Sequence, residues 1–534
     1  MTGIKDQDPN IKYIRLFTVL SVIISLFARG VFAVNKTADD FDRLVDTGRF
    51  EEASAAVENT PSGAERHFLQ AKLYFYEGRY GDAAAEMGKI EGLKDGKSER
   101  GALASYYAVL DRNTRDDKVF ESEHFVFKAG GRDAVLAAYA LEALEKIYAS
   151  IGNGLGCFPP AKVLVEIHGS KRGFSLASTL GEDVLEKSGT VGICKFNRLM
   201  LLSPENLPLG YAWADTLCHE YTHFVVNRLS GGRCPLWLQE GIAKYYETSW
   251  RSSPPLYLTP SAKNALAAAK KHDNYITFKR MHPSLVFLKD QDEILRAFAE
   301  VSCSVDYMQQ KYGPKVVAKL TGLMSESDEK QAFNSALGIR EERFEKDFFS
   351  YLKGLSFEES PGAVPDKLSF EKVPEEEFIG ADLRGQIRLG DRMRQIGKPE
   401  AAAVQYAKAL ELEPANPVVM LKIAKALSEA GDTAGAITQL KAAAEKNPNY
   451  VTVFEALGEL YFRQGDADNA INVLLKANLI NPFDPTLHYC LSRSYLAKND
   501  AAKAVLEMRV LLILQPDDAE TKLLLEKTER GLNK

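Results

Sequence analysis

The pattern of apolar and polar positions divides the chain into a mixed central part between two helical parts. In the central part, β-branched and aromatic residues are enriched at 124–129 and at 161–169, which predicts two strands. An apolar-periodic helix over 133–151 joins them, and residues 189–204 predict a strand pair that turns near Phe196. Residues 260–355 have mostly helical periodicity. We therefore expect an α+β domain with a small mixed sheet in the middle of the chain.

The last third of the chain repeats with a period of 34 residues. Prolines and alanines recur at this spacing, as Pro414, Pro448, Pro482 and Pro516 and as Ala402, Ala436, Ala470 and Ala504. Small alanines let paired helices approach, and proline cannot continue a helix. Residues that can end a helix in the left-handed conformation stand between the paired helices: Gly397, Gly431, Gly465 and Asn499. The pattern resembles the tetratricopeptide repeat and predicts four repeats and a capping helix, the repeats being 383–416, 417–450, 451–484 and 485–518.

The other domain boundaries follow from composition and from a weaker repeat. The hexapeptides GRFEEA and GRYGDA share a turn-then-helix pattern at a spacing of 30 residues. We expect them to belong to a helical-hairpin domain of the tetratricopeptide type over 34–115. A Pro- and charge-rich stretch predicts a linker over 356–378. The central domain then covers 116–355, and the repeat domain covers 379–534.

The N-terminus has the pattern of an export signal. Basic residues precede an apolar run from Leu16 to Ala28, which has the length of a signal-peptide core and is short for a membrane span. Small residues end at Ala33, as they do before a cleavage site. The sequence predicts a signal peptide over 1–33 and a bacterial protein exported to the periplasm or cell envelope. The alternative is an uncleaved N-terminal segment that anchors the protein to the membrane.

Composition and charge limit the classes of partner that the protein is expected to bind. The 534 residues carry a net charge of −6, without the basic excess that nucleic-acid binding requires. Export permits disulfides, and the six cysteines show no CxxC spacing. Some bridging among the five cysteines between Cys157 and Cys303 and a set of buried free thiols are equally good interpretations.

A candidate metal site lies in the stretch TLCHEYTHFVVNR. His219 and His223 are four residues apart, so a helix places both imidazoles on one face, one turn apart. Two such nitrogens can bind one tetrahedral metal. Glu220 follows His219 and can reach a metal-bound water without being a ligand. The alternative is a pair of histidines on the polar face of an ordinary helix.

A catalytic zinc ion needs a third protein ligand and one open position. A histidine-rich metzincin site is excluded because Val226 and Leu229 replace the required Gly and His. Glu240 follows His223 by 17 residues, which leaves room for a turn and a returning helix, and Gly241 allows close packing beside it. We expect Glu240 to be the third ligand, with Cys234 as the rival.

The two stretches HEYTHFVVNR and PLWLQEGIAKYYE together resemble the gluzincin clan of zinc metallopeptidases. They are most similar to the bacterial peptidase MA-like domain, in which HExxH is followed by a W-L-x-E-G-x-A segment. The resemblance covers 116–355. It implies an α+β metallopeptidase domain, in which a small mixed sheet joins the HExxH helix and a helical subdomain, flanked by all-α repeats.

The resemblance also implies one Zn²⁺ ion bound by His219, His223 and Glu240, with Glu220 as the catalytic base. The chain departs from the family at Phe298, where a tyrosine is frequent, and this leaves the oxyanion-stabilising residue open. Four side chains are candidates for that role, each with a packing role as the alternative: Tyr245, Tyr246, Tyr307 and His282. Two carboxylates are candidates for orienting the histidine ligands: Asp215 and Glu247.

The predicted function is peptide-bond hydrolysis by a zinc-activated water, with Glu220 as general base. The substrate would be a protein or peptide, and a protein partner or substrate would dock on the repeats. An extended peptide could add to a free edge of the strand at 198–204, although a plain core strand is an equal alternative. The rival functions are a catalytically inactive, peptidase-like scaffold in an envelope complex and hydrolysis of a non-peptide amide.

Overall fold

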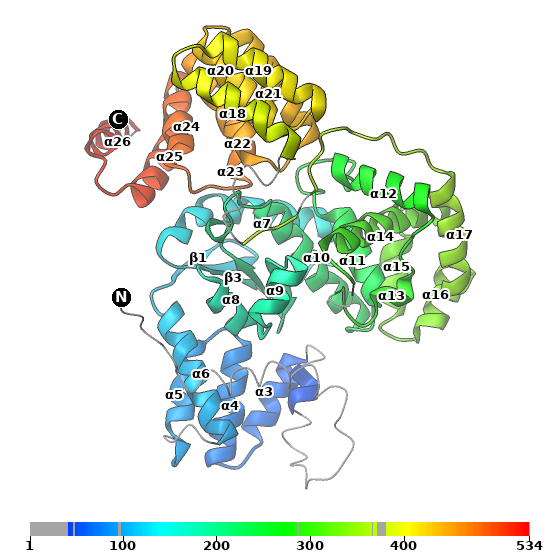
Figure 1. The fold of residues 1–534 in the computed structure, drawn as a ribbon. Coiled ribbons are helices and arrows are strands. Elements are labelled where there is room, and N and C mark those ends of the chain that lie inside the picture. The colour runs from blue at the N-terminus through cyan, green and yellow to red at the C-terminus, as the bar shows by residue number, and fades with distance from the viewer. Residues whose placement is uncertain are drawn as a thin grey trace, which may run out of the picture.

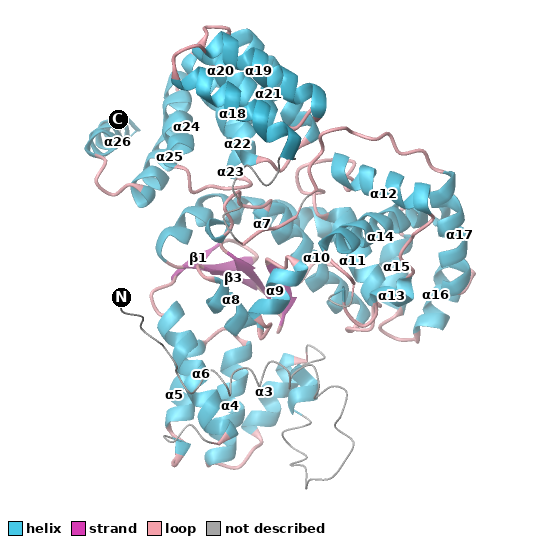
Figure 2. Ribbon diagram, viewed as in Figure 1, coloured by secondary structure: helices cyan, strands magenta, loops and turns pink. Residues whose placement is uncertain are grey.

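The computed structural model describes residues 41–45, 49–93, 98–285, 288–365, 367–370 and 381–532. The predicted signal peptide lies outside the described residues. The described chain is mostly helical, with one small five-stranded mixed sheet and helical repeats of the tetratricopeptide type (Figures 1 and 2). Among these residues, none of the helices combines the length and the apolar character that a membrane span requires.

The N-terminal part packs its helices as antiparallel hairpins. They are α3 (Phe50–Glu58), α4 (Ala64–Tyr76), α5 (Tyr80–Gly88) and α6 (Glu99–Thr114). The turn between α4 and α5 contains Gly78, whose φ of +70° favours glycine. A Cβ atom at Gly78 would lie 2.7 Å from the Glu166 carboxylate and 2.8 Å from the Arg198 guanidinium. This turn therefore packs directly against the central sheet.

The sheet has the order β1-β2-β3-β5-β4. Its strands are β1 (Lys118–Glu121), β2 (Phe125–Ala129), β3 (Val163–His168), β4 (Gly192–Lys195) and β5 (Arg198–Leu202). Strands β2, β3 and β5 are parallel, and the two edge strands are antiparallel to their neighbours. The long helix α7 (Ala134–Leu155) connects β2 to β3, and the helices α8 (Lys171–Ser178) and α9 (Glu182–Ser188) lead from β3 to β4.

For the strand at 198–204, a free edge and a plain core strand were equal alternatives, and the structure has the core strand. The strand at 198–204 is β5, which pairs with β3 on one side and with β4 on the other. The edge strand is β4, because the hairpin that turns at Phe196 and Asn197 folds β4 onto the outer side of β5. Strand β5 therefore has no free edge for a peptide.

A helical subdomain follows the sheet. It begins with α10 (Trp213–Ser230) and α11 (Leu236–Tyr246), and α10 ends at Gly231 in the left-handed conformation. It continues with α12 (Pro260–His272), α13 (Phe278–Met281), α14 (Gln291–Tyr312), α15 (Val316–Leu323), α16 (Glu329–Leu337) and α17 (Glu341–Gly354). Trp237 of α11 stacks on Phe278 with ring centroids 3.7 Å apart, and both rings lie in a core that includes Phe344.

The C-terminal region carries paired helices with the predicted period. The pairs are α18 (Ala381–Gln395) with α19 (Pro399–Leu412), α20 (Pro417–Glu429) with α21 (Thr433–Lys446), α22 (Val451–Arg463) with α23 (Ala467–Asn478), and α24 (Pro485–Ala497) with α25 (Ala501–Leu514). Helix α26 (Ala519–Leu532) follows them. The predicted left-handed residues between paired helices all have positive φ, from 59° to 89°: Gly397, Gly431, Gly465 and Asn499.

The repeats dock on the central domain at the start of α10. The indole Nε1 of Trp213 donates to the carbonyl of Asn478 at 2.9 Å, and the Tyr211 amide donates to the carbonyl of Ile480 at 3.1 Å. Tyr139 of α7 donates to the buried carboxylate of Glu507 at 2.8 Å. The third and fourth helix pairs thus contact the central domain, and the third contacts the helix that carries the two candidate histidine ligands.

All six cysteines are free thiols in the structure, so the interpretation with disulfides is not the one observed. Four of them are buried: Cys218, Cys234, Cys303 and Cys490.

Candidate metal centre

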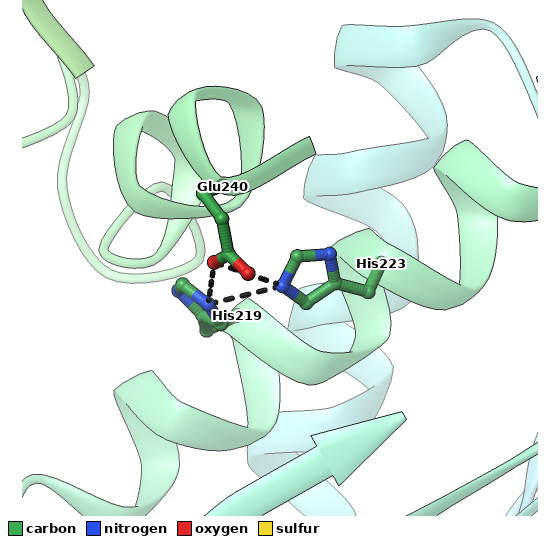
Figure 3. Close-up of side chains that lie close together, drawn as sticks. All are labelled: His219, His223 and Glu240. Atoms are coloured by element: carbon green, nitrogen blue, oxygen red, sulfur yellow. Dashed lines mark hydrogen bonds and ion pairs between the residues drawn. The ribbon is translucent and has the colours of Figure 1, made fainter. Parts of the chain in front are cut away.

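The two histidines of the HEYTH stretch lie together on α10. Their Nε2 atoms are 3.2 Å apart, and their side chains are 14% and 12% exposed. The spacing of four residues on a helix produces this approach, and the apolar side of the same helix, including Leu217 and Tyr221, is buried in the core. Both imidazoles therefore point toward one spot (Figure 3).

Glu240 reaches the same spot from the neighbouring helix α11. Its Oε2 atom is 3.4 Å from the Nε2 atom of His219 and 3.4 Å from that of His223. Ligands bound to zinc at about 2.0–2.1 Å in tetrahedral geometry are separated by about 3.3 Å. The three sides of this triangle, 3.2, 3.4 and 3.4 Å, agree with that separation. The donor set of two imidazoles and one carboxylate is also one that catalytic zinc uses.

The rival ligand is not part of this group. Among the described residues, the cluster that could hold a metal ion consists of His219, His223 and Glu240. Cys234 is buried before α11, where its carbonyl accepts a hydrogen bond from Gln239 at 2.9 Å. Burial raises the pKa of its thiol, which disfavours the thiolate that a metal would need.

The charges of the group are mutually dependent. Burial opposes the ionised form of Glu240, but the two imidazoles outweigh it and hold the pKa of this carboxyl well below its usual range. Burial likewise opposes the imidazolium of His219, yet Glu240 and Glu247 outweigh it and raise its pKa to about 10. The carboxylates thus favour a positive charge at this position, which a cation or protons can supply.

Of the two carboxylates considered for orienting the histidines, Glu247 contacts one. Its Oε2 atom is 3.5 Å from the Nδ1 atom of His219, on the side of the ring opposite Glu240. Asp215 instead forms a two-bond ion pair with Arg251, at 2.6 and 2.7 Å. Only Glu247 therefore lies where it can fix the ring orientation of a ligand.

Glu220 lies between the histidine group and the sheet edge. Its side chain faces β4, because a Cβ atom on Gly192 would be 2.8 Å from its Oε1 atom. Burial raises the pKa of this carboxyl, and the two histidines and the backbone N–H of Cys194 partly offset that rise. The role of Gly192 was missed from the sequence; a glycine within a predicted strand was the signal of a close approach.

The tyrosines considered for oxyanion stabilisation pack against other aromatic rings. Tyr307 accepts a hydrogen bond from Lys311 at 2.8 Å and stacks on Tyr351. Tyr245 packs edge-on against Tyr246, and His282 is exposed next to a cis proline. The ring that contacts a candidate ligand is Phe298, whose centroid is 6.1 Å from that of His219.

The comparison with protein families concerns the repeats. A tetratricopeptide-repeat family model matches residues 421–485, so the C-terminal region carries tetratricopeptide repeats. No curated protein is similar enough to match the chain.

Solved structures with similarity to the chain include one that is described as a TPR protein. A crystal structure of MamA has 23% identity over 27% of this chain and 84% of that one, with a TM-score of 0.26. TTC0263, a thermophilic TPR protein in Thermus thermophilus, has 24% identity over 28% of this chain and 82% of that one, with a TM-score of 0.24. A chain of the APC/C hetero-tetramer Cut9-Hcn1 has 14% identity over 97% of this chain and 73% of that one, with a TM-score of 0.25.

Proposed function

We propose that the protein is an exported zinc metallopeptidase of the gluzincin type that hydrolyses peptide bonds. The observation that carries the proposal is the triangle formed by His219, His223 and Glu240, whose sides match the ligand separations of tetrahedral zinc. The similarity of the HExxH and W-L-x-E-G-x-A stretches to the peptidase MA-like domain supports the same function. The periplasm or cell envelope is the proposed location, with a membrane anchor as the alternative.

The chain's own residues divide the chemistry between them. A bound zinc ion would acidify a water molecule and polarise the scissile carbonyl. Glu220 is the proposed general base: it takes a proton from the attacking water and delivers it to the leaving amine. Burial raises the pKa of its carboxyl, which brings it closer to the range that proton transfer near neutral pH favours. Glu247 orients His219 through the Nδ1 atom.

The edge of β4 is the proposed binding surface for an extended substrate. Phe196 and Asn197 have φ of 55° and 56°, as in a two-residue type I′ hairpin turn. In such a hairpin Lys195 and Ile193 exchange hydrogen bonds with β5, so the backbone of Cys194 points away from β5. The outward N–H of Cys194 bonds to Glu220, so a peptide strand added beside β4 would bring its scissile bond close to the base.

The repeats are proposed to bind a protein partner or substrate, because stacked helix pairs present an extended concave surface. The same repeats favour the second candidate function, a peptidase-like scaffold without activity. Both functions share the same ligands and the same Glu220, so an activity measurement distinguishes them.

The test combines metal analysis and proteolysis on the full chain. We expect about one zinc ion per wild-type molecule and a loss of zinc in His223→Ala. Equal zinc in the two proteins would refute the site. Glu220→Gln should retain zinc while its peptidase activity falls at least a hundredfold, since general-base catalysis contributes about 10²–10⁴-fold. Zinc without peptidase activity in the wild type would instead favour the scaffold.

A further inference from the structure

The side-chain amide of Gln291 binds the backbone of the chain's own linker. Its Oε1 atom accepts the N–H of Leu368 at 3.1 Å, and its Nε2 atom donates to the carbonyl of the same residue at 3.2 Å. The amide thus pairs with both polar groups of one residue, as a neighbouring strand would. Its Nε2 atom also lies 3.4 Å from the carbonyl of Glu186. Gln291 therefore connects the linker, the helical subdomain and the segment that precedes β4.

The linker is held in the same manner at other points. Asn264 of α12 exchanges two hydrogen bonds with the backbone of Ser360, at 2.7 and 2.9 Å. Asn447 of the repeats accepts from the N–H of Val364 at 2.8 Å and donates to the carbonyl of Gly362 at 3.1 Å. The predicted linker is thus not a free tether in its described part. Carboxamide side chains fix its backbone to both the central domain and the repeats.

The Gln291 contact lies near one end of the proposed binding surface along the edge of β4. Phe298, which contacts His219, follows Gln291 by seven residues on α14, so the two lie on one face about 10 Å apart. The side chain of Gln291 also lies 3.3 Å from a Cβ position on Gly189, which precedes β4. Gly189 precedes Gly192 by three residues, a distance of at most about 10 Å. Gly192 in turn faces Glu220.

An extended peptide advances about 3.3 Å per residue along such an edge. Gln291 therefore lies about three residues from the point of cleavage. We propose that Gln291 forms a backbone-binding subsite for extended peptides and that Leu368 of the linker occupies it as an internal competitor. This inference rests on the proposed function, since it assigns both a substrate subsite and an internal competitor to the proposed binding surface along β4.

A proline at position 368 tests the competitor without changing the subsite. Leu368→Pro removes the N–H that bonds to Gln291 and leaves the Gln291 side chain intact. Val364→Pro is the matched control, because it removes one N–H bond to the carboxamide of Asn447 on the repeats and leaves the contact with Gln291 in place. The probe is a fluorescent synthetic peptide with the sequence of residues 363–370, and its binding is measured by polarisation with a metal chelator present.

We expect the peptide to bind Leu368→Pro about fivefold more tightly than wild type or Val364→Pro, which is the worth of about one hydrogen bond. Adding Gln291→Ala to Leu368→Pro should abolish the gain. With zinc present, Leu368→Pro should have an about fivefold lower KM for peptides that extend more than three residues from the cleaved bond toward Gln291. Its kcat should stay within twofold of wild type.

The two hypotheses fail in different ways. The expected changes in peptide affinity, found in a protein without peptidase activity, would refute the proposed peptidase function and support the subsite. Peptidase activity together with equal peptide binding and equal KM in Leu368→Pro and Val364→Pro would overturn the subsite. Equal binding by Leu368→Pro with and without Gln291→Ala would also overturn it.

Discussion

Gly241→Ala is the substitution that tests most directly how the fold fixes the third ligand. Gly241 lies on α11 beside Glu240 and packs against the backbone of α14. A Cβ atom at this position would lie 2.7 Å from the carbonyl oxygen of Val301 and 3.1 Å from a methyl group of Val305. The carbonyl belongs to a helix and cannot rotate away. The added methyl group must therefore separate α11 from α14.

The required displacement follows from these distances. Ordinary contact between such atoms begins at about 3.4 Å, so the helices must separate by about 0.7 Å (3.4 minus 2.7). Metal sites tolerate errors of about 0.2 Å in ligand position. Glu240 moves with α11 while His219 and His223 stay on α10, so we expect zinc affinity to fall at least tenfold. Overpacking costs about 1–3 kcal/mol, and the helix propensity of alanine offsets about 1 kcal/mol.

The assay is competition for zinc against a chromophoric chelator, with urea unfolding of the metal-free protein beside it. Gly322→Ala on α15 is the matched control, because a Cβ atom there meets no heavy atom within 4 Å. It should leave zinc affinity unchanged and stabilise the protein by up to about 1 kcal/mol. If Gly241→Ala binds zinc as tightly as wild type while it is folded, the packing of α11 on α14 does not position Glu240, and the reasoning is refuted.

Three further contacts or buried groups are tested by substitution. Glu247→Gln weakens the partner of His219 Nδ1, so zinc affinity measured by the same competition should fall about tenfold. Arg198→Met leaves the carboxylate of Glu166 buried without its ion-pair partner. Urea unfolding should show that the free energy of unfolding falls by about 3–5 kcal/mol, and the added substitution Glu166→Met should largely restore it. Burial raises the pKa of Glu300 to about 8, above its unfolded value near 4.5. Between these pH values the native state holds a proton that the unfolded state has lost, so stability falls as the pH rises. Glu300→Gln should flatten this dependence by about 1.4 kcal/mol per pH unit, and an unchanged slope in a pH series of unfolding curves would contradict the assignment.

The parts of the fold that the sequence predicts well are those with local causes. The 34-residue period places glycine or asparagine where each first helix must end, and the positive φ at Gly431 and Asn499 agrees with that physical argument. The four-residue spacing of His219 and His223 is equally local, since one helix turn brings their rings together. The approach of Glu240 is predictable because the turn between α10 and α11 is too short to allow many arrangements.

The identity of the edge strand depends on non-local pairing. The sequence left a free edge and a plain core strand as equal alternatives for 198–204, and the structure has the core strand. Strand β5 pairs in parallel with β3, and the helices α8 and α9 and the strand β4 lie between them in the chain. The continuous apolar run at 199–202 favours a buried strand over the half-buried β4, but the run does not show which strands lie on its two sides. The linker contacts are similarly non-local, because Gln291 and Leu368 are 77 residues apart and a single carboxamide leaves no periodic signal.

The N-terminal helices and the C-terminal repeats, here called the two helical arms, both contact elements that form the candidate site. The ring of Phe196, at the turn between β4 and β5, packs on Tyr76 of the N-terminal helices with centroids 4.7 Å apart. Trp213, the first residue of α10, donates to the carbonyl of Asn478 in the repeats. One arm therefore supports the sheet edge, and the other supports the helix with the histidines. Deleting either arm would disturb the site as well as remove a binding surface, so only single substitutions such as Glu220→Gln can separate a peptidase from a scaffold.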